Sequence, residues 1–180
     1  KFLTDALELE KQKVPTRKLL EDPYHFWYIG KSYYDSTLGD YPLGMDHIKE
    51  YARRSIFYFG QYLNFKHDYH KTGKAKEIDE LAYFALYAMG DMFKLRGNYE
   101  KALDCGMKAE EFAPSRNEHI VLQAECYKDL SDFDSMKLQT DRLMNPDRKL
   151  PFPQFNFLLN MEHYNDSGKY SEELHQIANQ

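Results

Sequence analysis

The stretch that decides the fold runs from Asp79 to Pro114 and reads DELAYFALYAMGDMFKLRGNYEKALDCGMKAEEFAP. This spacing predicts two helices joined at Gly97 and Asn98, since a glycine followed by asparagine interrupts a helix. Gly90 then lets the second helix lie close to the first, and Pro114 stops that second helix. Seven small, aromatic or turn-forming residues carry the pattern at offsets 0, 3, 7, 9, 12, 19 and 24: Gly90, Phe93, Gly97, Tyr99, Ala102, Ala109 and Pro114.

The same offsets are those of a tetratricopeptide repeat, a helix–turn–helix unit of about 34 residues. Related pieces occur along the rest of the chain. Gly30 repeats the place of Gly90, Phe133 follows Tyr99 by one period, and Tyr41 and Tyr170 are anchors of two further units. We therefore predict an all-α fold, a right-handed superhelical array of about four irregular, antiparallel helix pairs.

The chain is expected to divide into an N-terminal helical segment, residues 1–22, and the repeat domain, residues 23–180. Periodicity is lost between about residues 64 and 76, where NFKHDYHKTGKAK is polar and contains Gly73. An insertion or long turn is therefore predicted there. Residues 150–153, LPFP, are typical of an extended linker before the fourth unit.

Composition narrows the function classes. The chain has 180 residues, 42% of them hydrophobic and 29% charged, which is ordinary for a globular protein. Its net charge of −5 argues against binding to nucleic acid or to an anionic membrane. No apolar run approaches the roughly 20 residues of a membrane span. Two cysteines, both in predicted helices, favour a reducing compartment, so we expect a cytoplasmic protein.

Four stretches, in chain order, go beyond a generic repeat. They read DPYHFWYIGKSYYD, DELAYFALYAMGDMFKLRGNYEKAL, KAEEFAPSRNEHIVLQAECY and LPFPQFNFLLNMEHYNDSGKY. Together they resemble the helical tail that follows the catalytic domain in some family-2-type glycosyltransferases. The resemblance implies a fragment of a longer enzyme with an accessory role, such as oligomerisation or docking of a partner or acceptor. A start at Lys1 rather than at Met fits a fragment.

Catalysis by these residues has little support. The catalytic domain of that family is similar to folds that hold a nucleotide sugar with an Asp-x-Asp motif, and the one such motif here, Asp132 to Asp134, falls in a predicted turn where capping is expected. No Gly-rich phosphate loop or nucleophile elbow occurs. His67 and His70 come closest to a metal cluster but lack further ligands. We expect no catalytic residue, metal or cofactor in this segment.

The better candidate site is the concave face, which the first helices of each pair line in superhelical arrays. Aromatic rings beside charged groups suit a peptide or a sugar, although the same residues can pack between helices instead. Trp27, the only tryptophan, is the expected exposed anchor. Arg116 either binds an anion or belongs to a capping box of Ser115 and Glu118. The candidate binding residues are Tyr24, Trp27, Lys31, Tyr34, Phe84, Tyr87, Asp91, Arg116 and Glu125.

Three function classes follow. The first is a non-catalytic accessory domain of a glycosyltransferase that docks a protein partner, its own catalytic domain or a glycan acceptor, or forms a homo-oligomer. The second is a free-standing tetratricopeptide adaptor that holds a peptide in its concave groove. The third, an enzyme that uses a metal at His67 and His70, has the weakest support.

Overall fold

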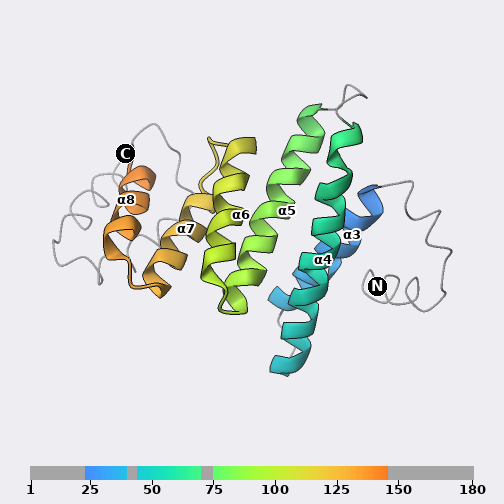
Figure 1. The fold of residues 1–180 in the computed structure, drawn as a ribbon, viewed down its shortest axis with the longest axis horizontal. Coiled ribbons are helices and arrows are strands. Elements are labelled where there is room, and N and C mark those ends of the chain that lie inside the picture. The colour runs from blue at the N-terminus through green and yellow to red at the C-terminus, as the bar shows by residue number, and fades with distance from the viewer. Residues whose placement is uncertain (1–22, 40–43, 70–74, 146–180) are drawn as a thin grey trace.

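A computed structural model describes residues 23–39, 44–69 and 75–145, with the side chains of all but 65–69 and 75–78. Within these ranges all regular secondary structure is helical and there is no strand, so the all-α prediction is confirmed there. Figure 1 shows the helices standing side by side in a row. They are α3 (Pro23–Leu38), α4 (Met45–Tyr69), α5 (Ala75–Leu95), α6 (Tyr99–Phe112), α7 (Glu118–Asp129) and α8 (Phe133–Leu143).

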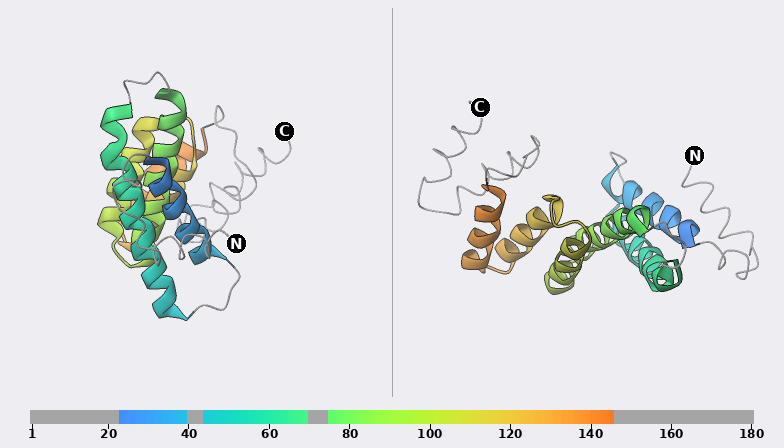
Figure 2. Two further views of the ribbon diagram at one scale, coloured as in Figure 1. Left: turned by 90° about the vertical axis from the view of Figure 1, so that its right-hand side faces the viewer. Right: turned by 90° about the horizontal axis from the view of Figure 1, so that it is seen from above.

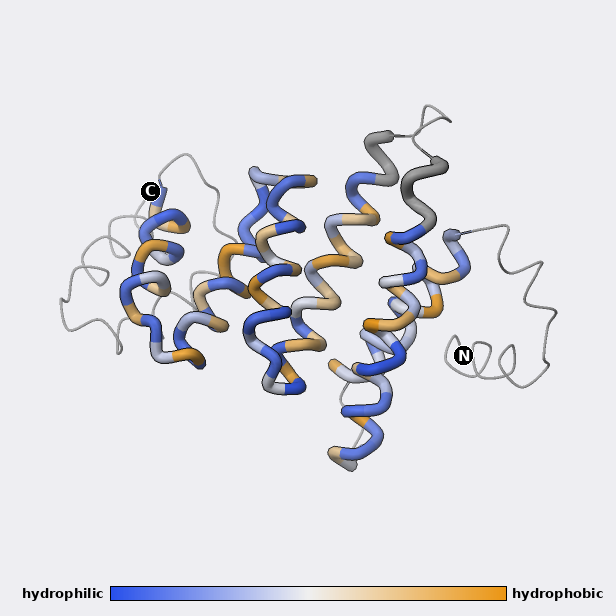
Figure 3. Tube along the Cα trace, viewed as in Figure 1, coloured by the Kyte–Doolittle hydropathy of each residue, from blue (hydrophilic) through white to orange (hydrophobic). Residues whose placement is uncertain are grey.

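The helices form two layers around α5. Each helix packs against the next one in the chain, and α5 also contacts both α3 and α7. Seen from above, α3 and α7 lie on one side of the row and α4 and α6 on the other (Figure 2). Figure 3 shows hydrophobic and hydrophilic residues on every described helix, as expected where each helix buries only part of its surface.

Local sequence explains two of the turns. Gly97 has a φ of 74°, a left-handed conformation that glycine adopts without steric cost, and the Asn98 side chain accepts a hydrogen bond from the Lys101 N–H (3.2 Å) at the start of α6. The Asp132 carboxylate accepts from the Ser135 N–H (3.1 Å) and caps α8, so the predicted capping role of this motif is confirmed for Asp132. The neighbouring Phe133 is 46% exposed and does not act as a buried anchor.

Two glycines mark the closest approaches between helices. A Cβ built at Gly90 of α5 would lie 2.4 Å from Leu122 Cδ2 of α7 and 3.3 Å from the Ala102 carbonyl oxygen of α6. A Cβ at Gly30 of α3 would lie 2.9 Å from the Phe59 ring of α4. At both positions a neighbouring side chain would have to shift to admit a methyl group: the end of Leu122 at Gly90 and the Phe59 ring at Gly30. The predicted close approach of helices at Gly90 is confirmed.

The core between α3, α4 and α5 combines small and aromatic side chains. Ala82, Ala85 and Ala88, spaced three residues apart on α5, are fully buried. Their small side chains leave room for Trp27 and Phe59, which belong to the same buried cluster. Alternation of small and large groups across a helix interface allows close packing without voids.

Most of residues 64–76, for which the sequence predicts an insertion or long turn, is helical, so the predicted long turn is wrong over that part. Helix α4 continues to Tyr69 and α5 begins at Ala75, which leaves only residues 70–74 outside the described helices. Polar and charged residues such as lysine are good helix formers, so the loss of an apolar stripe does not by itself end a helix. The predicted N-terminal segment, the Tyr41 anchor and the fourth unit lie outside the described residues.

Replacement of Gly90 by leucine should lower the free energy of unfolding by about 1–3 kcal/mol, because the new side chain overpacks the contact with Leu122 and Ala102. The matched control is Gly60→Leu, because a Cβ at Gly60 of α4 meets nothing within 4 Å and leucine is the better helix former. Urea unfolding followed by circular dichroism compares the two variants. Equal losses of stability would contradict this account of the helix contacts.

Candidate functional site

Most of the predicted binding residues lie in the layer of α3, α5 and α7, where they contact one another across the helix interfaces. Between α3 and α5, the Tyr34 hydroxyl donates a hydrogen bond to Asp91 Oδ2 at 2.8 Å. Between α5 and α7, Lys94 forms an ion pair with Glu125. These polar groups thus join the three helices, and the structure brings together residues that lie far apart in the sequence.

Trp27 is a core residue, so the prediction of an exposed anchor is wrong. Its side chain is 8% exposed, and its Nε1 donates a hydrogen bond to the Leu81 carbonyl oxygen of α5 at 3.1 Å. The indole ring lies 5.4 Å from the Phe84 ring and 6.4 Å from the Phe59 ring, measured between centroids. Rotation of α3 about its axis aims Trp27 at α5 and leaves the adjacent Tyr28 62% exposed.

Asp91 is the centre of the polar contacts between α3 and α5. Burial raises the pKa of the Asp91 carboxyl, although hydrogen bonds from Tyr34 and Tyr87 and the charge of Lys94 oppose this shift. Burial, together with the charge of Asp91, also raises the pKa of both phenols, which therefore remain neutral donors. For Lys94, burial alone would lower the pKa, but the contact with Glu125 raises it. In this network the Lys94 ammonium therefore stays charged, and the phenols of Tyr34 and Tyr87 stay neutral.

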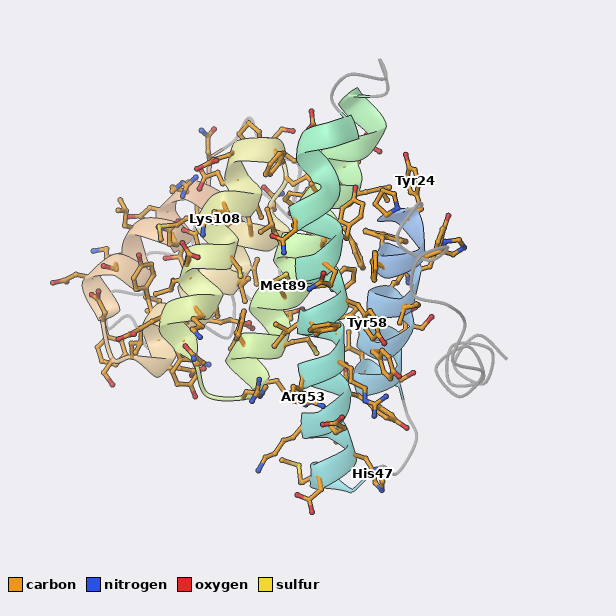
Figure 4. The ribbon with its side chains drawn as sticks, turned by 45° about the vertical axis from the view of Figure 1, so that its right-hand side comes forward. Tyr24, His47, Arg53, Tyr58, Met89 and Lys108 are labelled. Atoms are coloured by element: carbon orange, nitrogen blue, oxygen red, sulfur yellow. The ribbon has the colours of Figure 1, made fainter. Side chains whose placement is uncertain are left out.

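Lys31 and Tyr24 lie on α3, away from the Asp91 network. Lys31 pairs with Asp35 at 2.5 Å, and its ammonium lies 5.7 Å from the Phe84 ring centroid. Tyr24 is half-buried near the beginning of α3 (Figure 4). Among the nine predicted residues, Tyr34, Tyr87 and Asp91 are joined directly by hydrogen bonds, and Phe84 contacts both Tyr34 and Lys31.

Arg116 lies two residues before α7, beside an aromatic ring and a carboxylate. Its guanidinium is 4.8 Å from the Tyr83 ring centroid and 3.9 Å from Glu118 Oε1. The other oxygen of Glu118 accepts hydrogen bonds from the Tyr83 hydroxyl (3.0 Å) and the Asn117 N–H (3.2 Å). The N-cap of α7 is Asn117, so the predicted capping box with Ser115 is wrong.

A groove that the sequence analysis did not predict lies between α4 and α6, with α5 at its floor. Its volume is about 740 Å³. Figure 4 shows Met89 of α5 and Lys108 of α6 on the opposite side of α4 from Tyr24 and α3. The lining residues are Gly60, Leu63 and Asn64 of α4, Leu86, Met89 and Phe93 of α5, and Lys101, Asp104, Cys105, Lys108, Glu111 and Phe112 of α6.

Gly60 adds no side chain to the α4 wall of this groove, which Leu63 and Asn64 also line. A Cβ at this position would meet nothing within 4 Å, so no packing contact requires a glycine here. Glycine in a helix interior costs about 1 kcal/mol relative to alanine. Gly60 therefore lowers the stability of α4, serves no packing contact and widens the groove. This isolated glycine in FYFGQYL is the sequence signal that could have located the groove.

The lining suits the binding of an apolar surface. The floor consists of Leu86, Met89 and Phe93, and the charged residues all belong to the α6 wall. Burial raises the pKa of the Cys105 thiol to about 12, so this side chain stays protonated at neutral pH and is a poor nucleophile. The groove therefore offers apolar contact area with a charged rim on one side.

No model of a known protein family matches the chain, and no curated protein matches it either. Among the residues that the structure describes, no helix is long and apolar enough to cross a membrane. The same residues include no group of three or more His, Cys, Asp or Glu side chains placed to hold a metal ion. His67 and His70 lie outside the residues whose side chains are described. The proposed function therefore rests on the geometry of the groove and of the α3–α5–α7 layer.

Trp27→Ala should lower the free energy of unfolding by about 3–5 kcal/mol, because it leaves a cavity in the core and removes a donor to Leu81. The adjacent Tyr28→Ala is the control, since an exposed side chain should change stability by no more than about 0.5 kcal/mol. Thermal and urea unfolding measure both. A Trp27→Ala variant as stable as Tyr28→Ala would show that the indole is not part of the core.

Asp91→Asn should change how stability depends on pH. As the pH rises from about 4, the unfolded chain loses its Asp91 proton before the folded chain does, because burial raises the folded pKa. The folded chain then binds more protons, so the wild type should lose stability relative to the variant with rising pH and level off above the folded pKa. Urea unfolding at a series of pH values gives this difference. An advantage of the wild type that grows with pH would contradict the buried carboxyl.

Proposed function

We propose that the chain is a tetratricopeptide-like domain, a right-handed superhelical array of helix pairs that performs no catalysis and docks a protein. Three features support the repeat architecture. The helices pair as α3 with α4, α5 with α6 and α7 with α8. Gly30 lies at the close contact of the first pair, and Gly90 lies where α5 approaches both α6 and α7. Helix α5 also touches α3. Such arrays expose extended surfaces for partners.

The observation that carries the docking proposal is the groove between α4 and α6. Protein–protein recognition favours apolar pockets with polar rims, and this groove has a floor of leucine, methionine and phenylalanine beside a charged wall. Gly60 supports the same conclusion, because it weakens α4 without a packing role. A glycan acceptor fits less well, because the floor of leucine, methionine and phenylalanine offers no hydrogen-bonding side chain to a sugar hydroxyl.

We further propose that the domain is the accessory part of a glycosyltransferase and that the groove holds its own catalytic domain or a protein that the enzyme acts with. The ordered match to the helical tails of family-2-type glycosyltransferases supports this assignment. A free-standing adaptor that binds a peptide is the alternative. It would use the same groove, because Trp27 and Tyr34 on the α3–α5–α7 layer are buried.

The gene that encodes this chain should also encode a nucleotide-sugar-binding domain upstream of Lys1. That domain, produced separately, should bind the chain, and Gly60→Leu should weaken the affinity at least about tenfold by filling the groove. Gly44→Leu, at an exposed glycine outside the groove, is the control. Isothermal titration calorimetry gives the affinities.

Two results would contradict this proposal. A native start codon at Lys1 with no upstream domain would favour the free-standing adaptor over the accessory domain. Equal affinities of the wild type and Gly60→Leu for the catalytic domain would exclude the groove as the docking surface for that domain.

A further inference from the structure

We propose that the groove takes one amphipathic helix of a partner protein, which lies between α4 and α6 and runs antiparallel to both. This inference rests on the proposed docking function and names the kind of partner. Helices α4 and α6 point the same way, because each is antiparallel to α5, the helix between them (Figure 1). The occupant would therefore run parallel to α5 and complete a group of four helices around the groove.

The floor matches the apolar stripe of a helix. Leu86, Met89 and Phe93 line the groove at steps of three and four residues on α5, over about 10 Å, or two helical turns. Met89 and Phe93 are half-buried, and Leu86 is only 6% exposed, in a cluster against which Leu63 and Phe112 pack. A helix in such a groove contacts it through apolar residues at i, i+3 or i+4, and i+7. The unbranched Met89 side chain adapts to the shape of the residue that it meets.

The walls favour a helix over an extended peptide. An extended segment that binds as an added strand needs backbone donors and acceptors at the site, and a groove between two helices offers few, because helix backbones bond internally. A helical occupant satisfies its own backbone groups and requires only side-chain contacts. On the α4 wall, the absence of a side chain at Gly60 lets the backbone of the occupant come close, as glycine does at other close helix contacts in this chain.

Charge on the α6 wall sets the orientation. Lys101 lies in the first turn of α6 and Glu111 in the last, about 15 Å apart along the helix axis. Between them, Asp104 and Lys108 pair with each other at 2.6 Å. The negative C-terminal end of a helix is favoured beside Lys101 and its positive N-terminal end beside Glu111, which is the antiparallel arrangement. The occupant should also carry an acidic side chain near Lys101 and a basic one near Glu111.

Selection of peptides against the full 180-residue chain tests this inference. The probes are two displayed libraries of 14-residue peptides, one biased to helix and one fully random. Selected peptides should carry apolar residues at i, i+3 or i+4, and i+7, become helical by circular dichroism when bound, and lose at least about tenfold in affinity for Gly60→Leu. Gly60→Ala, which adds only a methyl group, should retain most of the affinity.

Reversal of one charge tests the orientation. Lys101→Glu should weaken the selected peptides about tenfold when an acidic residue lies near the peptide C-terminus, and a lysine at that peptide position should restore the affinity. Lys137→Glu, at an exposed position of α8 outside the groove, is the control and should change nothing. Loss of binding that the peptide lysine does not restore would overturn the antiparallel arrangement.

The outcomes separate this inference from the proposed function. Peptides that contain proline or lack the apolar period, yet lose affinity for Gly60→Leu, would overturn the helical occupant and leave the groove as a docking site. Peptides that bind the wild type and Gly60→Leu equally well, or a selection that enriches no peptide, would overturn both the helical occupant and docking in this groove.

Discussion

The contact at Gly90 is the constraint on which the rest of the described structure depends. At this position α5 meets α6 and α7 together, and a Cβ would lie 2.4 Å from the end of the Leu122 side chain and 3.3 Å from the Ala102 carbonyl oxygen. Because one helix is fixed against two others at a single position, the spacing and the tilt of all three are coupled. The left-handed turn at Gly97 then directs α6 back along α5, so sequence and geometry agree at this helix pair.

Helix α5 has two functionally different sides. Toward α3 and α7 it presents Asp91 and Lys94, whose contacts with Tyr34 and Glu125 join the layer. Toward α4 and α6 it presents Leu86, Met89 and Phe93, which line the floor of the groove. Met89 and Phe93 are half-buried there, whereas Leu86 is only 6% exposed. Polar groups that are already paired within the fold have little capacity left for a ligand. Apolar surface that contacts water, in contrast, gives a favourable free energy of binding when a partner covers it. The apolar side of α5 at the groove is therefore better suited to binding a partner than its polar side toward α3 and α7.

Stability and binding oppose each other at Gly60. A larger residue there would strengthen α4 without any steric conflict, yet it would fill the space between α4 and α6. Binding surfaces commonly retain residues that are suboptimal for folding. The charged α6 wall gives the groove a direction, and a partner that matches the apolar floor and both ends of that wall would be selected by charge as well as by shape.

The sequence by itself determined the helical class, the close contact at Gly90, the turn at Gly97 and the cap at Asp132, because propensity, turn conformation and capping act within a few residues. It also placed Tyr34, Tyr87, Asp91 and Glu125 on one layer from their periodicity. Only the tertiary structure decided that Trp27 turns into the core, that α4 extends to Tyr69, and that a groove opens between α4 and α6. These features depend on how each helix is rotated and how far apart its neighbours lie, and both follow from contacts between segments that are distant in the sequence.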